Sequence, residues 1–335
     1  MKIVVFEAEE RERGVFDPLL PANEIVFVSE PLRPGNAKEY AEAEVVSTFI
    51  YSDLGAAVIE QLPRLKLIAT RSTGYEHVSF AACKARGIAV ANVPTYGSNT
   101  VAEHIFALLL SISHRMPEAI ERAQRGDFSP FGLQGFDIAG KVLGVVGTGH
   151  IGRHVIRIAK GFGMKVVSFD AYPDERTAHG MGFHYATFDE LLARSDIISL
   201  HVPSTPETRH LLNSTTFAKM KDGVIIINTA RGELIETGGL IEALNSGKVA
   251  AAGLDVLPDE PMIREEAGLI HSIFNKEHDL RNLVANHVLL RMRNVIITPH
   301  SAFNTREAVH RIAETTQTNI AAFIEGRPEN LVIKD

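Results

Sequence analysis

Three side chains in the second half of the chain have the chemistry to support oxidation or reduction of a hydroxyl-bearing carbon. Arg231, Glu260 and His300 each follow a hydrophobic run that is typical of a buried strand. A guanidinium group matches the two oxygens of a carboxylate, and an imidazole can transfer a proton near neutral pH. We therefore interpret Arg231 as the anchor for a carboxylate substrate, His300 as the proton carrier and Glu260 as its anionic partner. The same spacing also fits solvated surface residues.

A glycine-rich segment in the middle of the chain predicts a site for a dinucleotide. The hydrophobic run Val142–Val146 leads into Gly-x-Gly-x-x-Gly, and an apolar helical pattern follows. The first glycine permits a tight turn, the second lets the backbone approach a pyrophosphate, and the third lets the helix pack on the strand. The start of that helix favours phosphate through its N–H groups and dipole. The residues assigned to this contact are Gly147, Gly149, His150, Ile151 and Gly152.

An acidic residue stands where such a site needs one. The next predicted strand ends at Asp170, 18 residues after Gly152. A carboxylate at that point binds the hydroxyls of the adenosine ribose and repels a 2′-phosphate. The residues that follow, Ala171, Tyr172 and Pro173, supply no basic group for such a phosphate. This pattern favours NAD over NADP, although a solvated aspartate at a strand end is the simpler alternative.

Other polar segments follow predicted strands at the edge where open α/β sheets bind ligands. The sequence has 14 histidines, most of which we expect to be surface or packed residues, and His201 is also compatible with packing. The residues of these segments that we expect to contact the cofactor are His201, Val202, Pro203, Thr208, Thr229, Ala230 and Arg231.

Short hydrophobic runs alternate with helical patterns along most of the chain. This alternation is typical of parallel sheets covered by helices on both faces, so the expected fold class is α/β with doubly wound parallel sheets. Residues 261–293 contain no such run and instead predict two helices. The predicted strands are 3–6, 25–28, 45–50, 65–70, 88–93, 142–146, 165–169, 197–202, 224–228, 250–256 and 295–298.

Two breaks in the pattern predict a discontinuous domain. A turn-rich stretch at 94–98 precedes a long helical pattern, and a closing helix after residue 301 is expected to return to the first third of the chain. We therefore predict one domain from residues 1–97 and 300–335, which would hold the substrate. The nucleotide-binding domain would then span residues 98–299.

Length, composition and charge exclude several classes of protein. The chain has 335 residues, 45 % of them hydrophobic, and a formal charge of −7. These values are typical of a globular protein of about two domains and disfavour binding to nucleic acid or to an anionic membrane. The single cysteine, Cys83, excludes a disulfide framework and a cysteine-ligated metal site. Because no signal peptide or membrane span is apparent, we expect a cytoplasmic protein without a metal.

Nine short stretches together resemble the D-2-hydroxyacid dehydrogenase family over nearly the whole chain. They are RSTGYEH at 71–77, NVPTY at 92–96, VAEH at 101–104, VVGTGHIG at 145–152, ISLHVP at 198–203, INTARG at 227–232, GLDV at 253–256, DEP at 259–261 and ITPH at 297–300.

The resemblance implies a flavodoxin-like substrate domain and a Rossmann domain that binds NAD. It also implies that Arg231, Glu260 and His300 form the catalytic set and that Asp255 lies near the nicotinamide. Backbone N–H groups around Thr73 and Gly74 would help Arg231 and His300 to bind the substrate, and the protein would be a homodimer.

Within the family the chain is most similar to the NAD-dependent D-lactate dehydrogenases. Tyr51 and Tyr96 match aromatic positions of their substrate pocket, which implies reversible reduction of pyruvate to D-lactate. Gly97 and Asn304 depart from the usual residues at the rim of that pocket. A reductase of glyoxylate, hydroxypyruvate or a bulkier 2-oxo acid is therefore an alternative. An alternative of a different class is a protein that senses NADH on the same fold and interacts with a partner.

Overall fold

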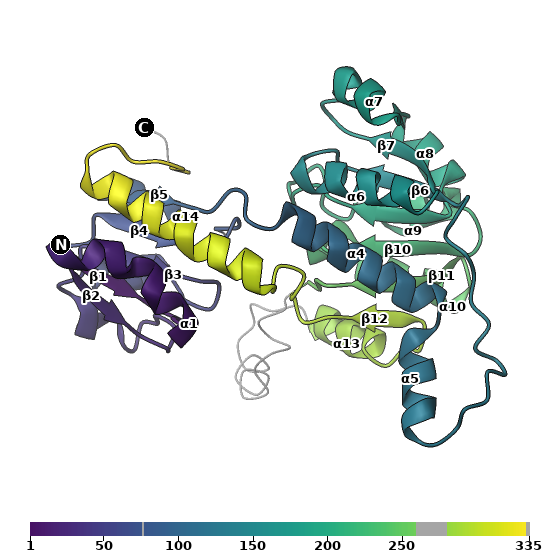
Figure 1. Ribbon diagram of the computed structural model, residues 1–335, viewed down its shortest axis with the longest axis horizontal. Coiled ribbons are helices and arrows are strands. Elements are labelled where there is room, and N and C mark those ends of the chain that lie inside the picture. Colours follow the sequence, from purple (N-terminus) through teal and green to yellow (C-terminus); the bar gives the residue numbers. More distant parts are fainter. Residues whose placement is uncertain (76, 259–279, 333–335) are drawn as a thin grey trace. The chain divides into compact units, whose positions relative to one another are not determined.

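The computed structural model describes residues 1–75, 77–258 and 280–332. The chain divides into two compact units, shown in Figure 1. The smaller unit consists of Met1–Gly97 and Asn304–Asp335, and the larger unit of Ser98–Phe303. Residues 300–303 thus belong to the larger unit, whereas the sequence interpretation assigned them to the smaller one. The reason is a set of hydrogen bonds from this segment to Asp255 of the larger unit.

The smaller unit is built on a sheet of five parallel strands in the order β2-β1-β3-β4-β5. This is the strand order of flavodoxin-like folds. Ile3 in β1 pairs with Ile25 on one side and with Val45 on the other. The strands are β1 (Lys2–Val5), β2 (Glu24–Phe27), β3 (Val45–Thr48), β4 (Leu67–Thr70) and β5 (Ala89–Ala91).

Helices cover both faces of this sheet because successive strand residues point to opposite sides. Ile3 and Val5 pack in a cluster with Ile320, whereas Val4 packs with Ile59 in a second cluster. The first face is covered by α1 (Glu10–Arg13), the 3₁₀ helix η1 (Gly14–Ala22) and the long helix α14 (Arg306–Ile324) (Figure 1). The second face is covered by η2 (Ala37–Tyr40), α2 (Ala56–Glu60) and α3 (Phe80–Ala85).

The larger unit has seven parallel strands in the order β12-β11-β10-β9-β6-β7-β8. Counted along the chain from β6, this is the dinucleotide-binding order 3-2-1-4-5-6 with one further strand at the edge. The strand order reverses between β6 and β9, which makes their carboxyl ends the expected ligand site. The strands are β6 (Val142–Val146), β7 (Lys165–Phe169), β8 (His184–Tyr185), β9 (Ile197–Leu200), β10 (Val224–Asn228), β11 (Val249–Leu254) and β12 (Val295–Ile297).

Two hydrophobic clusters flank this sheet in the same alternating manner. Ile225 and Ile227 of β10 pack with α4 and α6 on one face, whereas Ile226 packs with α9 and α10 on the other. Helix α5 and the segment that follows it lead from α4 back to the sheet (Figure 1). The remaining elements are α4 (Ser98–Ser113), α5 (Met116–Gln124), α6 (His150–Gly161), α7 (Glu175–Met181), α8 (Phe188–Arg194), α9 (Ser214–Lys219), η3 (Gly232–Leu234), α10 (Thr237–Asn245) and α13 (Leu280–Leu289).

The structure confirms the predicted fold class, two α/β units on parallel sheets. Of the two helices expected in 261–293, the second is present as α13, and the first lies outside the described residues. The sequence interpretation missed η1, α5 and β8. Strand β8 has only two residues, and η1 contains Pro18 and Pro21, so neither shows the usual pattern. In the part of the chain that the structure describes, no helix has the length and hydrophobicity to cross a membrane.

Candidate active site

The glycine loop between β6 and α6 has the shape that a dinucleotide requires. Gly147 has a φ of +96°, and a Cβ there would lie 2.8 Å from the carbonyl oxygen of His201. A Cβ on Gly152 would lie 2.1 Å from the carbonyl oxygen of Gly147, so only glycine lets α6 pack this closely. Around Gly149, in contrast, the space that a Cβ would fill is open. The loop is therefore tight toward the protein and open at the helix start.

The open side of the loop fits a pyrophosphate. Gly149 is the N-cap of α6, and His150 and Ile151 form its first turn. The N–H groups of a first helical turn have no partner within the helix, and they favour an anion together with the helix dipole. These residues would hold the phosphates of a dinucleotide, as the sequence predicts.

Asp170 follows β7 and is fixed beside this loop. Its carboxylate accepts hydrogen bonds from the Thr148 N–H at 2.7 Å, the Thr148 hydroxyl at 2.8 Å and the Tyr172 N–H at 2.9 Å. Partial burial acts to raise the pKa of Asp170, but these bonds and the charge of Arg153 outweigh it and keep the pKa below its usual value. The carboxylate is therefore anionic at neutral pH, and a 2′-phosphate would meet its negative charge.

Thr148, Tyr185 and Arg153 support this corner, and the sequence analysis did not single them out. The Tyr185 hydroxyl lies 2.7 Å from the Thr148 hydroxyl, and Arg153 donates to the Thr148 carbonyl oxygen at 2.9 Å. Arg153 also pairs with Asp174 at 3.1 Å, so its charge is already shared with a carboxylate. Tyr185 comes from the short strand β8, which explains why its contribution was not visible in the sequence.

The segment after β9 lies against the glycine loop. The His201 N–H donates to the Val146 carbonyl oxygen at 2.7 Å, and Val202 lies beside Gly147. Burial lowers the pKa of His201 to about 3, so its imidazole is neutral at physiological pH. Thr208 binds within its own turn, because its hydroxyl donates to the Pro203 carbonyl oxygen at 2.6 Å. The sequence predicts that Thr208 contacts the cofactor, but in the structure its hydroxyl stabilises the turn at 203–208.

Arg231 stands in a turn that neighbouring residues hold closed. After β10, the Asn228 side chain accepts from the Ala230 N–H at 3.0 Å and donates to the Arg231 carbonyl oxygen at 2.8 Å. The Arg231 guanidinium donates to the Ala230 carbonyl oxygen at 2.8 Å. A Cβ on Gly232 would lie 2.2 Å from the carbonyl carbon of Leu257, so the chain after β10 touches the chain after β11. The predicted turn residues Thr229 and Ala230 lie in this same turn.

Asp255 binds the segment that contains His300. Its buried carboxylate accepts from the Thr298 hydroxyl at 2.5 Å, the Ser301 N–H at 2.9 Å and the Ala302 N–H at 2.9 Å. His300 itself has a φ of +52°, and its N–H donates to the Asp255 carbonyl oxygen at 2.9 Å. The structure thus uses Asp255 to hold His300 in a left-handed backbone conformation that residues other than glycine rarely adopt.

Helix α4 contributes a further contact to this carboxylate. His104 Nε2 lies 3.0 Å from the Thr298 hydroxyl and 3.5 Å from Asp255 Oδ1. Burial acts to raise the pKa of Asp255, but hydrogen bonds from His104, Thr298 and the two backbone N–H groups outweigh it and lower the pKa. The sequence analysis assigns no role to His104, which falls among the histidines expected to be surface or packed residues.

The predicted substrate residues of the smaller unit follow β3, β4 and β5. The Thr73 hydroxyl donates to the Val93 carbonyl oxygen at 2.8 Å, and the Ser72 hydroxyl donates to the Gly74 carbonyl oxygen at 2.5 Å. The carbonyl oxygen of Tyr96 accepts from Arg311 of α14 at 2.5 Å. The side chain of Tyr51 is about half exposed. The carboxyl edge of the smaller sheet therefore gathers these four positions, Tyr51, Thr73, Gly74 and Tyr96.

The candidate residues thus form two groups, one at the carboxyl edge of each sheet. Arg231, Asp255 and His300 follow the neighbouring strands β10, β11 and β12. Glu260 lies outside the described residues. Among the residues that are described, no group of three or more His, Cys, Asp or Glu side chains could hold a metal ion.

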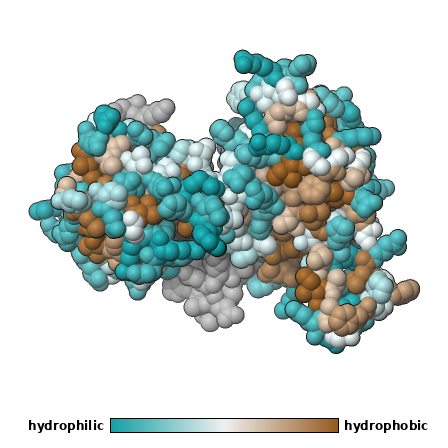
Figure 2. Space-filling model, in the orientation of Figure 1, coloured by the Kyte–Doolittle hydropathy of each residue, from teal (hydrophilic) through white to brown (hydrophobic). Residues whose placement is uncertain are grey.

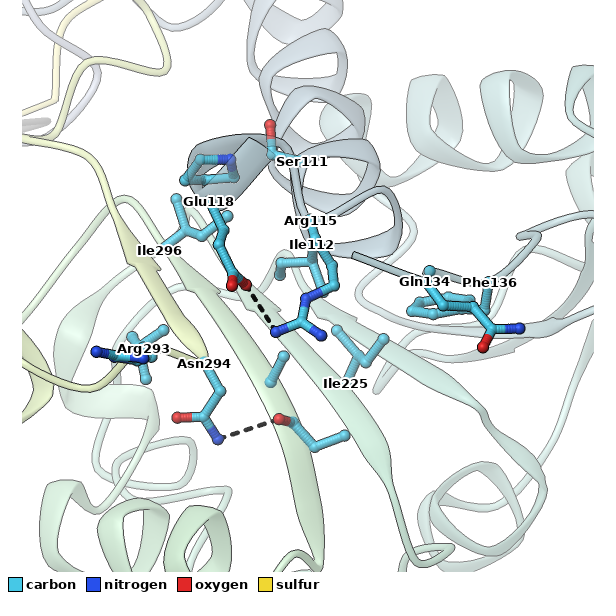
Figure 3. A pocket seen from close by; sticks show the side chains of 15 residues that line it. Ser111, Ile112, Arg115, Glu118, Gln134, Phe136, Ile225, Arg293, Asn294 and Ile296 are labelled. Carbon is cyan, nitrogen blue, oxygen red and sulfur yellow. Dashed lines mark hydrogen bonds and ion pairs between the residues drawn. The ribbon is translucent and has the colours of Figure 1, made fainter. Parts of the chain in front are cut away.

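A cavity of about 370 Å³ in the larger unit lies at the opposite, amino edge of the sheet. It is lined by the first residues of β11 and β12 together with α4 and α5 (Figure 3). Its polar groups bind one another: Arg115 pairs with Glu118 at 2.7 Å, and Asn294 donates to the Ala250 carbonyl oxygen at 3.1 Å. Because open α/β sheets bind ligands at their carboxyl edge, we do not assign the catalytic site to this cavity.

Known proteins resemble this chain over its whole length. Residues 106–302 match the family model described as D-isomer specific 2-hydroxyacid dehydrogenase, NAD binding domain. The D-lactate dehydrogenase of Escherichia coli strain K12 is 36 % identical over 99 % of this chain and 100 % of its own length. The glyoxylate reductase of Thermococcus litoralis is 34 % identical over 93 % of this chain and 91 % of its own. The structure of Aquifex aeolicus D-lactate dehydrogenase with NAD and lactic acid aligns with a TM-score of 0.85 at 34 % identity, covering 99 % of each chain.

Proposed function

The chain belongs to the NAD-dependent D-2-hydroxyacid dehydrogenase family, and on that premise we propose that it reversibly reduces pyruvate to D-lactate. The observation that supports this reaction is the arrangement of three strand ends in the larger unit. Arg231, Asp255 and His300 follow β10, β11 and β12, which are adjacent in the sheet. A carboxylate-binding cation and a proton carrier therefore lie at one edge, together with the group that fixes the proton carrier.

The residues have separate tasks in this reaction. NAD, when bound by the glycine loop and Asp170, accepts or supplies the hydride. Arg231 binds the substrate carboxylate through its planar fork and polarises the keto oxygen. His300 donates a proton to that oxygen during reduction and takes it back during oxidation. Glu260 is assigned as the anionic partner of the protonated imidazole.

The smaller unit is assigned the recognition of the substrate. The backbone N–H groups of Thr73 and Gly74 would bind the carboxylate together with Arg231. Tyr51 and Tyr96 would close one side of the pocket and leave room for a methyl group. Similarity to a D-lactate dehydrogenase at 36 % identity supports pyruvate as the substrate. Similarity to a glyoxylate reductase at 34 % supports the alternative of a smaller 2-oxo acid.

A panel of glyoxylate, pyruvate, hydroxypyruvate and phenylpyruvate, each with NADH and with NADPH, tests the proposal. We expect NADH to be preferred, pyruvate to have one of the highest values of kcat/KM, and the product to be D-lactate by chiral analysis. Formation of L-lactate would contradict the proposed stereochemistry. A clear preference for another acid would replace pyruvate as substrate, and NADH binding without turnover of any acid would favour a sensing role.

Two variants test the assigned chemistry. His300→Ala should lower kcat roughly 10²–10⁴-fold, because it removes a positioned proton carrier, and should leave the Kd for NADH unchanged. Arg231→Lys keeps the charge but loses the fork, and we expect kcat/KM for pyruvate to fall more than about tenfold. His310→Ala is the matched control, because His310 is exposed on α14 and pairs with Glu314 at 3.2 Å.

A homodimer is part of the same proposal, since the family resemblance implies it. The segment that follows α5 in the larger unit, residues 125–136, exposes hydrophobic side chains (Figure 2). Its Phe128 and Phe131 are 84 % and 87 % exposed. Aromatic side chains are enriched in the buried centres of protein–protein interfaces, so these two residues are the proposed contact with the second copy. Light scattering should show a dimer for the parent protein and a monomer for the Phe128→Asp, Phe131→Asp double variant. A parent protein that is monomeric at micromolar concentration would refute it.

A cytoplasmic location is proposed on the character of the one cysteine. Cys83 is buried, and burial raises the pKa of its thiol to about 11, so it is unreactive and pairs with no second cysteine. Cell fractionation of the full chain tests this location.

A further inference from the structure

Glu7 binds a loop that lies more than forty residues further along the chain. It lies two residues after the end of β1, and its carboxylate accepts hydrogen bonds from the Phe49 N–H at 2.8 Å, the Tyr51 N–H at 2.7 Å and the Ser52 hydroxyl at 2.6 Å. The Ser52 hydroxyl in turn accepts from the Leu32 N–H at 2.9 Å. One carboxylate therefore holds the backbone of the 49–52 loop at two alternate positions.

This contact continues the sheet by means of a side chain. The pairing of β1 with β3 ends at Val5 and Ser47, and the Phe6 N–H donates to the Ser47 carbonyl oxygen at 2.9 Å. Beyond that point the two carboxylate oxygens of Glu7 accept from residues 49 and 51, in the way that the carbonyl groups of a neighbouring strand accept from alternate residues. The loop is thus held in register with β1, although among the described residues no strand pairs with it there.

The backbone of Glu7 is itself fixed in an unusual conformation. Its φ is +53°, in the left-handed region that a residue with a Cβ rarely adopts. The buried guanidinium of Arg71 donates to the carbonyl oxygens of Phe6 at 2.8 Å and of Glu7 at 2.7 Å, and it lies 3.6 Å from the Glu12 carboxylate. Strained backbone of this kind persists only where the surroundings determine it, and it collects at functional sites.

From these contacts we infer that Glu7 is a positioning residue that fixes the Tyr51 side of the substrate pocket and so determines the size of the acid that is accepted. Tyr51 is 54 % exposed, and its ring lies 6.3 Å from the ring of Phe49, so the two rings move with the loop backbone that Glu7 binds. Glu7 grips that backbone at the Tyr51 N–H itself. The inference rests on the proposed function, in which Tyr51 lines the pocket.

The test uses Glu7→Gln, which has the same shape but cannot accept at both ends. One oxygen of Glu7 accepts from Tyr51 and the other from Phe49 and Ser52, so an amide NH₂ would face an N–H donor in either orientation. We expect the KM for pyruvate to rise about tenfold, the equivalent of one hydrogen bond to a charged group. The Kd for NADH and the value of kcat should change less than about threefold. Glu10→Gln, an exposed neighbour, is the matched control with parental kinetics.

A double-variant cycle separates positioning from general destabilisation. If Glu7 acts through Tyr51, the Glu7→Gln, Tyr51→Ala protein should show the same KM as Tyr51→Ala alone, and both should lose the discrimination between pyruvate and phenylpyruvate. Additive changes in KM would overturn the inference. If Glu7→Gln does not fold, Ser52→Ala removes one of the three bonds, and we expect a rise in KM of about threefold. An unchanged KM in that variant would also overturn it.

Hydrogen exchange provides a readout that does not depend on the reaction. The amides of Phe49 and Tyr51 should exchange at least about tenfold faster in Glu7→Gln than in the parent, because they lose their acceptor. Equal exchange would refute the positioning role even if every 2-oxo acid is a substrate. Faster exchange in a protein that reduces no 2-oxo acid would defeat the proposed function, and with it the role in selecting the acid, while leaving the grip of Glu7 on the loop established.

Discussion

In each sheet a carboxylate at the carboxyl edge holds a loop that carries a candidate site residue, but the backbone strain lies at different residues. In the larger unit Asp255 holds the segment after β12, and the strained residue is the one that is held, His300, with a φ of +52°. In the smaller unit the strained residue is the holder, Glu7, with a φ of +53°, and Arg71 pins its backbone.

Under the proposed function, the two loops serve different parts of the reaction, because His300 is the proposed proton carrier and Tyr51 the proposed pocket wall. A proton carrier must be held within a fraction of an ångström of its working position, and strain at His300 is tolerable only because Asp255 fixes the residues on either side. A side chain that only limits the size of the substrate, the role proposed for Tyr51, tolerates a less exact position. We therefore expect changes at Asp255 to affect kcat and changes at Glu7 to affect KM.

The largest expected effect is a loss of stability in the smaller unit, where Arg71 fixes the backbone of Glu7. Arg71→Met leaves the buried Glu12 carboxylate without its cationic partner, and we expect the free energy of unfolding to fall by about 3–5 kcal/mol. Urea denaturation measures this. Arg11→Met is the control, because Arg11 pairs with Glu9 at the surface and should cost less than about 1 kcal/mol. If both variants lost the same free energy of unfolding, the Arg71–Glu12 pair would stabilise the protein no more than a surface ion pair.

The second largest expected effect is on kcat, through Asp255 of the larger unit, which holds the segment that contains His300. In Asp255→Asn the side-chain amide replaces one acceptor of the segment that holds His300, so the imidazole loses its fixed position. We expect kcat for pyruvate to fall about 100-fold with little change in the Kd for NADH. Steady-state kinetics and NADH fluorescence measure the two quantities, and the exposed Asp222→Asn is the control. A weaker affinity for NADH with unchanged kcat would show that Asp255 serves the nicotinamide, near which the family resemblance places it, and not the position of His300.

A smaller effect on kcat is expected for one of two threonines, one at the carboxyl edge of each sheet. Thr298→Val removes the hydroxyl between His104 and Asp255, and we expect kcat to fall about tenfold. Thr48→Val removes a buried hydroxyl for which the described part of the structure shows no partner, so it should leave kcat unchanged. Stopped-flow measurement of NADH oxidation decides between them. A Thr48 variant that loses as much activity as the Thr298 variant would contradict the assignment.

The smallest effect concerns pH. The pKa of Asp255 is lowered in the folded protein, where hydrogen bonds from His104, Thr298, Ala302 and Ser301 outweigh the effect of burial. The stabilising contribution is therefore fully present above the unfolded pKa of about 3.9 and is lost as the pH falls through the lower folded value. Thermal unfolding should show the parent about 1 kcal/mol more stable than Asp255→Asn at pH 6. The gap should close below about pH 4, and a gap that widens there would reverse the sign.

The sequence predicted the sheets well because their strands are buried on both faces. The predicted run Val224–Asn228 is hydrophobic up to Ile227, and β10 has the predicted bounds. The glycine loop was also visible, because tight turns and close packing restrict the residue type at each position. In both cases the physical cause acts on residues that are neighbours in the chain.

The supporting contacts of the site were not predictable in this way. The residues of the His104–Thr298 contact are 194 positions apart, and those of the Glu7–Phe49 contact are 42 apart. Neither pair has a local pattern, because a partly buried histidine and a glutamate after a strand are compatible with many structures. The sequence offered one signal, a charged residue, Glu7, just after an apolar strand. The role of that charge could not be read from it, because the 49–52 loop comes near Glu7 only in the folded protein.

The discontinuous smaller unit has a consequence for the order in which the protein is made. Helix α14 supplies Ala313 and Ile320 to the cluster beneath β1 and β3, and Asn319 binds the Asn92 carbonyl oxygen at 2.9 Å. The ribosome releases these residues only after the whole larger unit has been synthesised. During translation the larger unit can therefore fold first. Until α14 has been synthesised, the face of the smaller sheet that it covers stays exposed to water and to chaperones.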